Sequence, residues 1–400
     1  MINKNFTLIW IGKSISQLGD KFYSIALAWW ILQKTDSPSI MGTFLLVSVL
    51  PGLILGFFAG VLADRLSRKT ILIVTDTLRG FLVLVISFLA MFGVIEVWHV
   101  FVIGMCLSLA TAFFDPAIQA IIPQIVEKED LTRANAMSQM VSGVCTVAGP
   151  LLGAVSVSFF GLTAVFMANS GSYFISTILT SFVSRPKVTA NYSNKNNYIS
   201  DIKEGIRFIK NQKNIIFVLK IIALTHIFVG CLTVSLPFLA NSLAGIGVNN
   251  LGYLEAAMGA GIIGSSIIIK SIRKNIKNEF TLVKFIALMG VSFGLISAFK
   301  FSGLNTIYMY LIIMVLVGSC IAFASVFWQT LLQNSTPSNM TGRVFSVSSL
   351  IGNTSLPIAY SIFGVLLNIS SISVLMAISG GGLLIVCFGF YFQKIKMKSL

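Results

Sequence analysis

The chain alternates long apolar runs with short polar segments, and this pattern predicts its helices. An α-helix needs about 20 apolar residues to cross a bilayer core. Runs of this length predict six spans in the first half, at residues 8–33, 40–63, 71–92, 98–122, 134–158 and 162–183. A polar stretch at residues 184–213 follows. Six more spans are predicted at residues 214–240, 250–271, 280–300, 304–332, 344–367 and 371–393.

The spans predict an all-α integral membrane protein with 12 transmembrane helices in two groups of six. We expect an N-terminal six-helix bundle at residues 1–183, a cytoplasmic linker at 184–213 and a C-terminal six-helix bundle at 214–400. Composition agrees, because 56% of the residues are hydrophobic and only 10% are charged. Soluble domains have about 25% charged residues.

Lysine and arginine orient this layout. Of the 28 basic residues, 21 fall in segments that lie inside if both termini are cytoplasmic, whereas outer loops hold only Lys34 and Lys300. Such a bias marks the cytoplasmic side of a membrane protein. We therefore interpret the net charge of +15 as a topology signal and expect no nucleic acid partner. The predicted location is the cell inner (cytoplasmic) membrane, with several passes.

The residue inventory argues against an enzyme. The five cysteines lie inside apolar runs without metal or disulfide spacing, and the two histidines, His99 and His226, stand far apart. We interpret both histidines as packed or interfacial and not as proton relays. No GxxxxGK[ST] nucleotide motif is present, so ATP drive is not expected. We expect no cofactor and no metal site.

The second part of the linker has a helical pattern. From Ser200 onward, Ile202, Ile206 and Ile209 share one face and lysines lie opposite. This pattern is typical of an amphipathic helix on the inner membrane surface. A plain solvated connector is the alternative, because the apolar stripe is short.

The loop before the third span, "GVLADRLSRK" (60–69), is echoed before the ninth span by "IIIKSIRK" (267–274). The basic residues of the two segments match, but Asp64 falls opposite Ile269. Two parallel six-helix repeats are typical of a transporter whose substrate site lies between the halves, near the membrane midplane.

These motifs resemble those of the major facilitator superfamily. "GVLADRLSRK" is similar to the superfamily's Gly-x-x-x-Asp-Arg-x-Gly-Arg-Lys/Arg loop, with Ser67 in place of the usual glycine. "AGPLLGA" (148–154) resembles the antiporter motif through Gly149, Pro150 and Gly153, although Ala154 and Cys145 stand at positions that are often glycine. "SQLGD" (16–20), "FFDPAIQAIIP" (113–123) and "LTRANAMS" (131–138) look like the macrolide-efflux branch of drug:proton antiporters.

The resemblance implies the major facilitator fold and a cytoplasmic gate. In that superfamily an acid at the position of Asp115 pairs with the loop arginine, here Arg68. The implied gate residues are Gly60, Asp64, Arg65, Arg68 and Asp115. A role of Asp115 in proton transfer is the alternative.

An acid at the centre of the first span needs a partner or a function, because its insertion costs about 2.5–3.5 kcal/mol. Lys13, Gln17, Asp20 and Ser24 form one polar stripe on this helix, which we expect to face the central cavity. Asp20 is predicted to exchange a proton or to meet a cationic substrate. A structural ion pair, with Lys13 or another lysine, is the alternative.

Glu255, in the eighth span, is the second candidate for proton exchange. It shares a face with Gly252 and Gly259, so a neighbouring helix can pack close to it. An acid that stays hydrated at the outer rim is the alternative. Asp76 and Arg79 are three residues apart in the third span and are predicted to pair locally.

The predicted function is proton-coupled secondary active efflux of hydrophobic drugs, macrolide-like or multidrug, by alternating access. The alternative is a major facilitator exporter or importer of a metabolite, siderophore or peptide. The expected partners are a hydrophobic small-molecule substrate, protons and the lipid bilayer, and we expect a monomer.

Overall fold

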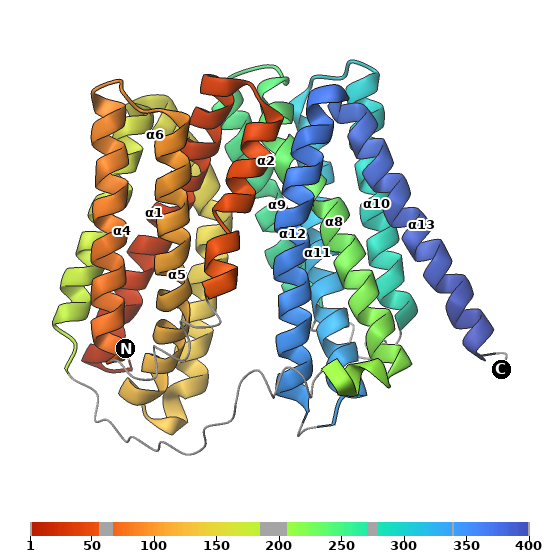
Figure 1. Cartoon of the computed structure of the whole chain (residues 1–400), viewed down its shortest axis with the longest axis horizontal. Coiled ribbons are helices and arrows are strands. Elements are labelled where there is room, and N and C mark those ends of the chain that lie inside the picture. Colours follow the sequence, from red (N-terminus) through yellow and green to blue (C-terminus); the bar gives the residue numbers. More distant parts are fainter. Residues whose placement is uncertain (1, 56–66, 185–205, 270–278, 338–339, 399–400) are drawn as a thin grey trace. The chain divides into compact units, whose positions relative to one another are not determined.

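The computed structural model describes residues 2–55, 67–184, 206–269, 279–337 and 340–398. Within these ranges every regular element is a helix (Figure 1). The chain divides into two compact units, Met1–Asn191 with Gly245–Ala256 and Tyr192–Ala244 with Ala257–Leu400. The start of the helix Gly247–Ile269 (α9) thus belongs with the first unit, and this start carries Glu255.

The helices of the chain's first half are α1 (Lys4–Thr35), α2 (Pro38–Val47), α4 (Arg68–Met91), α5 (Val97–Ile125), the short η1 (Lys128–Asp130) and α6 (Leu131–Ser181). Those of the second half are α8 (Lys213–Asn241), α9 (Gly247–Ile269), α10 (Glu279–Phe301), α11 (Ile307–Ser335), α12 (Thr341–Ile369) and α13 (Ile372–Lys398). Where the described ranges reach, these helices agree with the predicted spans to within a few residues, except in the span predicted at 40–63. There α2 ends at Val47, a turn follows, and residues 50–55 are again helical. Nine helices in the described part are long and apolar enough to cross a membrane.

The label α6 covers two of the predicted spans. Its 51 residues far exceed the length that one membrane crossing needs. Gly161 interrupts the helix with φ 77° and ψ 170°, a conformation that glycine adopts without steric cost. This break lies between the spans predicted at 134–158 and 162–183, so hydropathy located the boundary correctly.

Two residues of the charged loop have local structural roles. Ser67 caps the N-terminus of α4, because its hydroxyl accepts a hydrogen bond from the backbone N–H of Thr70 at 3.5 Å. Lys69 donates from Nζ to the carbonyl oxygens of Ser181 and Val183, at 2.6 Å each. These carbonyls end α6, where a cation is favoured. The predicted gate residues Gly60, Asp64 and Arg65 lie outside the described residues.

Corresponding helices pack alike in the two units. In the first unit α1 and α4 pack against α6, and α4 against α5. In the second unit α8 packs against α12, and α10 against α13 and α11. With α6 read as two helices joined at Gly161, the helix pairs of one unit correspond in chain order to those of the other. One buried core cluster of the first unit joins α1, α4 and α5 through Ile9, Leu72, Phe114 and Ile121.

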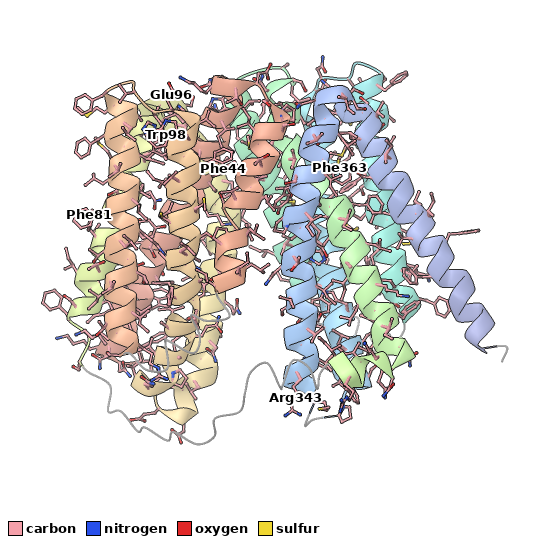
Figure 2. All side chains as sticks on the ribbon, viewed as in Figure 1. Phe44, Phe81, Glu96, Trp98, Arg343 and Phe363 are labelled. Atoms are coloured by element: carbon pink, nitrogen blue, oxygen red, sulfur yellow. The ribbon has the colours of Figure 1, made fainter. Side chains whose placement is uncertain are left out.

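Large apolar side chains also cover the outside of the helices. Phe81 of α4 is 56% exposed and projects away from its unit (Figure 2), whereas Phe363 of α12 is buried. Exposed apolar residues in such number are unfavourable in water but suit contact with lipid tails.

Only part of the predicted amphipathic helix lies in the described part of the chain. Residues 206–210 are helical, with Ile209 buried and Ile206 exposed. The segment from Ser200 to Gly205 lies outside the described residues, so the surface helix stays a prediction.

The antiporter-like glycines bring α6 against α1. A Cβ on Gly149 would lie 2.5 Å from Cβ of Lys21, and a Cβ on Gly153 would lie 2.9 Å from Cα of Phe22. Small residues at such a crossing let two backbones approach closely. The two motif glycines therefore let α6 pack closely against α1 at Lys21 and Phe22, next to Asp20.

Gly153→Ala is expected to destabilise the protein by about 1–3 kcal/mol, because backbone must move to admit the methyl group. The matched control is Gly171→Ala in the second part of α6, after the break at Gly161, where a Cβ would meet nothing within 4 Å. That control is expected to be neutral or stabilising, since alanine favours helix. Thermal unfolding midpoints of the purified proteins test this, and equal midpoints would contradict the packing argument.

Candidate functional site

Asp20 lies in a polar contact between α1 and the second part of α6. Its carboxylate is half-buried and accepts a hydrogen bond from the hydroxyl of Tyr173. Gly19 makes this contact possible, because a Cβ there would overlap the side chains of Asn169 and Ser172. The glycine beside the acid thus lets α6 approach Asp20 directly.

A buried ion pair on α4 lies next to this contact. Nη1 of Arg79 is 3.4 Å from Oδ1 of Asp76, and their side chains are only 4% and 1% exposed. The predicted local pair is therefore confirmed. Ser176 of α6 donates to Oδ2 of Asp76 at 2.7 Å, which ties the pair to the helix that carries Tyr173.

Arg79 connects the ion pair with Asp20. Its guanidinium lies over the ring of Phe114 at 4.1 Å from the centroid and over the ring of Tyr173 at 5.6 Å. A guanidinium over an aromatic face is attracted by the ring's quadrupole. Arg79 and Lys21 both lie within electrostatic range of Asp20. We call Asp20, Tyr173, Arg79, Asp76 and Ser176 the buried polar network.

Several buried polar atoms in and around this network lack a hydrogen-bond partner among the described residues. They are Nε and Nη2 of Arg79, Nδ2 of Asn169 and the hydroxyl of Tyr23. Each buried polar atom that stays without a partner costs about 1–3 kcal/mol, so such atoms are few in native proteins.

The other residues of the predicted stripe on α1 separate in the structure. Gln17 accepts a hydrogen bond from Ser142 of α6 at 3.4 Å. Lys13 is half-buried and lies within electrostatic range of Asp115. Ser24 is exposed and donates to the carbonyl of Lys21 at 2.9 Å. Among the stripe residues, Asp20 is the one that joins the buried polar network.

Asp115 of α5 is exposed within the first unit. Two cations, Lys13 and Arg79, lie within electrostatic range of its carboxylate. Arg68, its predicted partner, is half-buried in the first turn of α4. The Arg68–Asp115 pair stays a prediction.

Glu255 is half-buried about two turns into α9, and Lys21 lies within its electrostatic range. Gly252, one turn earlier, packs against Ala154 and the carbonyl oxygen of Pro150. The antiporter-like segment of α6 is thus flanked by α1 on one side and by the start of α9 on another. Lys21, next to Asp20 in the chain, is the cation that both candidate acids share.

Tyr173 and Ser176 escaped the sequence analysis, and the use of Arg79 beyond its local pair was missed. A signal was present, because Asn169, Ser172, Tyr173 and Ser176 follow spacings of three, one and three. This spacing places four polar side chains on one face of an apolar helix. Such a face requires a polar partner, which the structure identifies on α1 and α4.

Comparisons with known proteins place this chain in a family. The family model described as "Transmembrane secretion effector" matches residues 1–399. Macrolide efflux protein A of Streptococcus pyogenes is 24% identical over 355 residues, which cover 88% of this chain and 87% of that protein.

Solved structures agree on the fold. The nucleoside transporter NupG aligns with a TM-score of 0.76 and 13% identity over 96% of this chain and 98% of its own. A bacterial homologue of the iron transporter ferroportin, in an inward-facing state, aligns with a TM-score of 0.73 and 16% identity over 98% of both chains. The chain belongs to the transmembrane secretion effector family of the major facilitator superfamily, whose members are multi-pass membrane transporters.

Proposed function

We propose that this transporter exports hydrophobic drugs, macrolide-like or multidrug, in exchange for protons. The observation that carries the proposal is the buried polar network, in which Asp20 is bonded to Tyr173 beside the Asp76–Arg79 pair. The likeness to a relative named macrolide efflux protein A supports the substrate class. The buried polar network supports the proposal that the proton is the coupling ion.

The charges of the network give a reason for proton exchange. Asp20 and Asp76 are two carboxyls that share one guanidinium, Arg79. Within the network itself, one proton on the pair of carboxyls balances the charge of Arg79. Its loss leaves a negative charge in a poorly hydrated site that a cation outside the network, Lys21, must offset. Arg79, whose Nε and Nη2 have no partner among the described residues, and the nearby Lys21 are the cations that this negative charge attracts. The proton therefore changes the forces between α1, α4 and α6.

Such a force couples drug export to proton movement only if the two conformational states of the transporter bind the proton with different affinities. In the major facilitator fold the two halves expose a central site alternately to each side of the membrane. We propose that the protonated network favours one state and the bound drug favours the other. Glu255, which shares Lys21 with Asp20, is the second group proposed to exchange the proton. We propose both termini on the cytoplasmic side and a monomeric transporter.

Uptake into inverted membrane vesicles tests the substrate class. The panel contains macrolides, fluoroquinolones, cationic dyes, siderophores, nucleosides and peptides, each with and without a proton gradient. We expect uptake of a macrolide that collapses when the gradient is dissipated. Gradient-driven uptake of a siderophore, nucleoside or peptide alone would favour the alternative, a transporter of metabolites.

The cytoplasmic latch is a separate proposal. If Arg68 pairs with Asp115, the Arg68→Asp and Asp115→Arg changes should each reduce transport, and the double swap should restore part of it. The same vesicle assay measures all three variants. Two single losses that the swap does not repair would argue against a direct pair and for a role of Asp115 with Lys13 and Arg79.

A further inference from the structure

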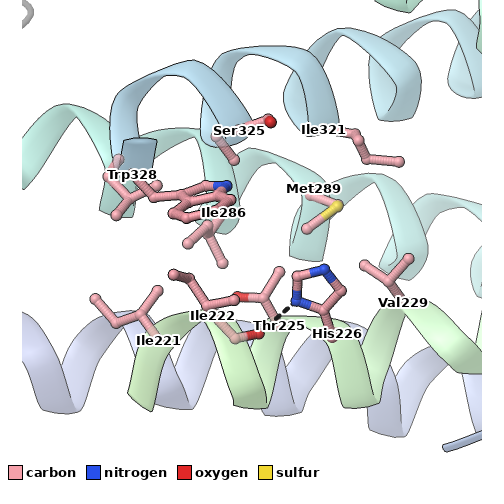
Figure 3. Close-up of a pocket in the computed structure, with 12 residues that line it drawn as sticks. Ile221, Ile222, Thr225, His226, Val229, Ile286, Met289, Ile321, Ser325 and Trp328 are labelled. Atoms are coloured by element: carbon pink, nitrogen blue, oxygen red, sulfur yellow. Dashed lines mark hydrogen bonds between the residues drawn. The ribbon is translucent and has the colours of Figure 1, made fainter. Parts of the chain in front are cut away.

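A small, partly open cavity lies within the second unit, between α8, α10 and α11 (Figure 3). Its volume is about 180 Å³. Thr225, His226 and Val229 of α8, Met289 of α10, and Ser325 and Trp328 of α11 are among the residues that line it. Aliphatic side chains, mainly isoleucines, form most of the remaining wall. The buried polar network belongs to the first unit, so this cavity is a different site.

The size and walls of the cavity favour one aromatic ring. An apolar protein cavity of about 150 Å³ holds a molecule of benzene. The present cavity therefore has room for a single ring with a small substituent. The ring of Trp328 and the sulfur of Met289 make favourable contacts with an aromatic ligand. A site with apolar walls and a few polar groups is the usual form of a small-molecule pocket.

Thr225 offers an unused hydroxyl to such a ligand. On other helices Thr111, Thr330 and Thr354 donate to the carbonyl four residues earlier, at 2.8, 2.8 and 2.7 Å. Oγ1 of Thr225 is buried and makes no hydrogen bond within the described residues. A buried hydroxyl without a partner costs about 1–3 kcal/mol, which a ligand that bonds to it would recover.

His226, the next residue, offers a hydrogen-bond acceptor. Its Nδ1 lies 2.8 Å from the carbonyl oxygen of Ile222 (Figure 3). A carbonyl only accepts, so in the neutral imidazole Nδ1 carries the hydrogen and Nε2 has a free lone pair. The ring stands out from α8 toward α10 and α11 in Figure 3. The cavity thus combines an acceptor and a hydroxyl on adjacent residues.

We propose that this cavity binds a small molecule with one aromatic ring and one hydroxyl group, a phenol. The ring lies among Val229, Met289 and Trp328. The hydroxyl donates to Nε2 of His226 and accepts from the hydroxyl of Thr225. This site goes beyond the proposed export function and requires neither proton coupling nor a macrolide substrate.

Quenching of tryptophan fluorescence by two bromine-bearing probes tests the proposal on the purified transporter in lipid nanodiscs. 4-Bromophenol has the ring and the hydroxyl, whereas bromobenzene has the ring alone, and bromine quenches a tryptophan that it touches. We expect saturable quenching by both probes, with tighter binding of 4-bromophenol. The saturable part should disappear in Trp328→Phe, which identifies the reporting residue.

Two pairs of variants separate the pocket from unspecific partition into lipid. Val229→Phe fills the cavity and should remove saturable quenching, while Val291→Phe, at a 46% exposed position of α10, should leave it unchanged. Thr225→Val keeps the side-chain shape and should weaken 4-bromophenol about tenfold but leave bromobenzene unaffected. Linear quenching in the wild type, or equal saturable quenching in Val229→Phe, would overturn the proposal. An equal effect of Thr225→Val on both probes would overturn the role of the hydroxyl.

Discussion

Asp20→Asn is expected to abolish proton-driven export while the protein stays folded in the membrane. The amide has nearly the same shape and its oxygen can still accept a hydrogen bond from Tyr173, so the α1–α6 contact persists. An amide cannot take up and release a proton, however, so the coupling ion loses its site. Drug uptake into inverted vesicles under a proton gradient should therefore fall to the level of vesicles without the transporter.

A matched control is available in the same chain. Asp36 ends α1 with φ 43°, a left-handed conformation that asparagine tolerates well. Asp36→Asn removes the same charge outside the buried polar network and should export at the wild-type rate. Normal gradient-dependent export by Asp20→Asn, with Asp36→Asn also active, would exclude the proton role of Asp20 and direct attention to Glu255.

Arg79→Gln is expected to have the largest effect on stability, a loss of about 3–5 kcal/mol. The change leaves the carboxylate of Asp76, only 1% exposed, without its cation. It also removes the guanidinium from the rings of Phe114 and Tyr173. Unfolding midpoints of the purified protein in detergent measure the loss. Arg133→Gln, at an exposed position near the start of α6, is the control and should be neutral.

A double-mutant cycle separates the ion pair from the packing of the arginine. Asp76→Asn alone leaves Arg79 buried beside a neutral partner, and the double change Asp76→Asn with Arg79→Gln leaves no buried charge in the pair. Because the two groups are in contact, the double variant should lose clearly less stability than the sum of the single variants. Strictly additive losses would contradict a direct interaction of the two side chains.

The sequence predicted most of the fold because membrane helices need long apolar runs. The run lengths located the helices, and even the boundary at Gly161 inside α6. The Asp76–Arg79 pair was predictable as well, since residues three apart in a helix share a face. The link from this pair to Asp20 was not, because Tyr173 is 153 residues from Asp20 and Ser176 is 100 residues from Asp76. Such contacts depend on which helices pack together.

Two residues have surroundings that the sequence did not predict. Ser67 departs from the usual glycine of the loop motif, and in the structure its hydroxyl caps α4. His226 was interpreted as packed or interfacial and not as a proton relay. In the structure it lines the cavity of the second unit, beside the hydroxyl of Thr225, which has no hydrogen-bond partner among the described residues. No spacing along α8 reveals this cavity, because α10 and α11 supply the rest of its wall.

Proton movement driven by substrate tests the central claim most directly. The purified transporter is reconstituted into liposomes that contain a pH-sensitive dye, without an imposed proton gradient, and a macrolide gradient is applied. Export in exchange for protons predicts that the macrolide flows down its gradient and that protons move the opposite way. Asp20→Asn should eliminate this proton movement. Macrolide flow through the wild type without proton movement would contradict the account.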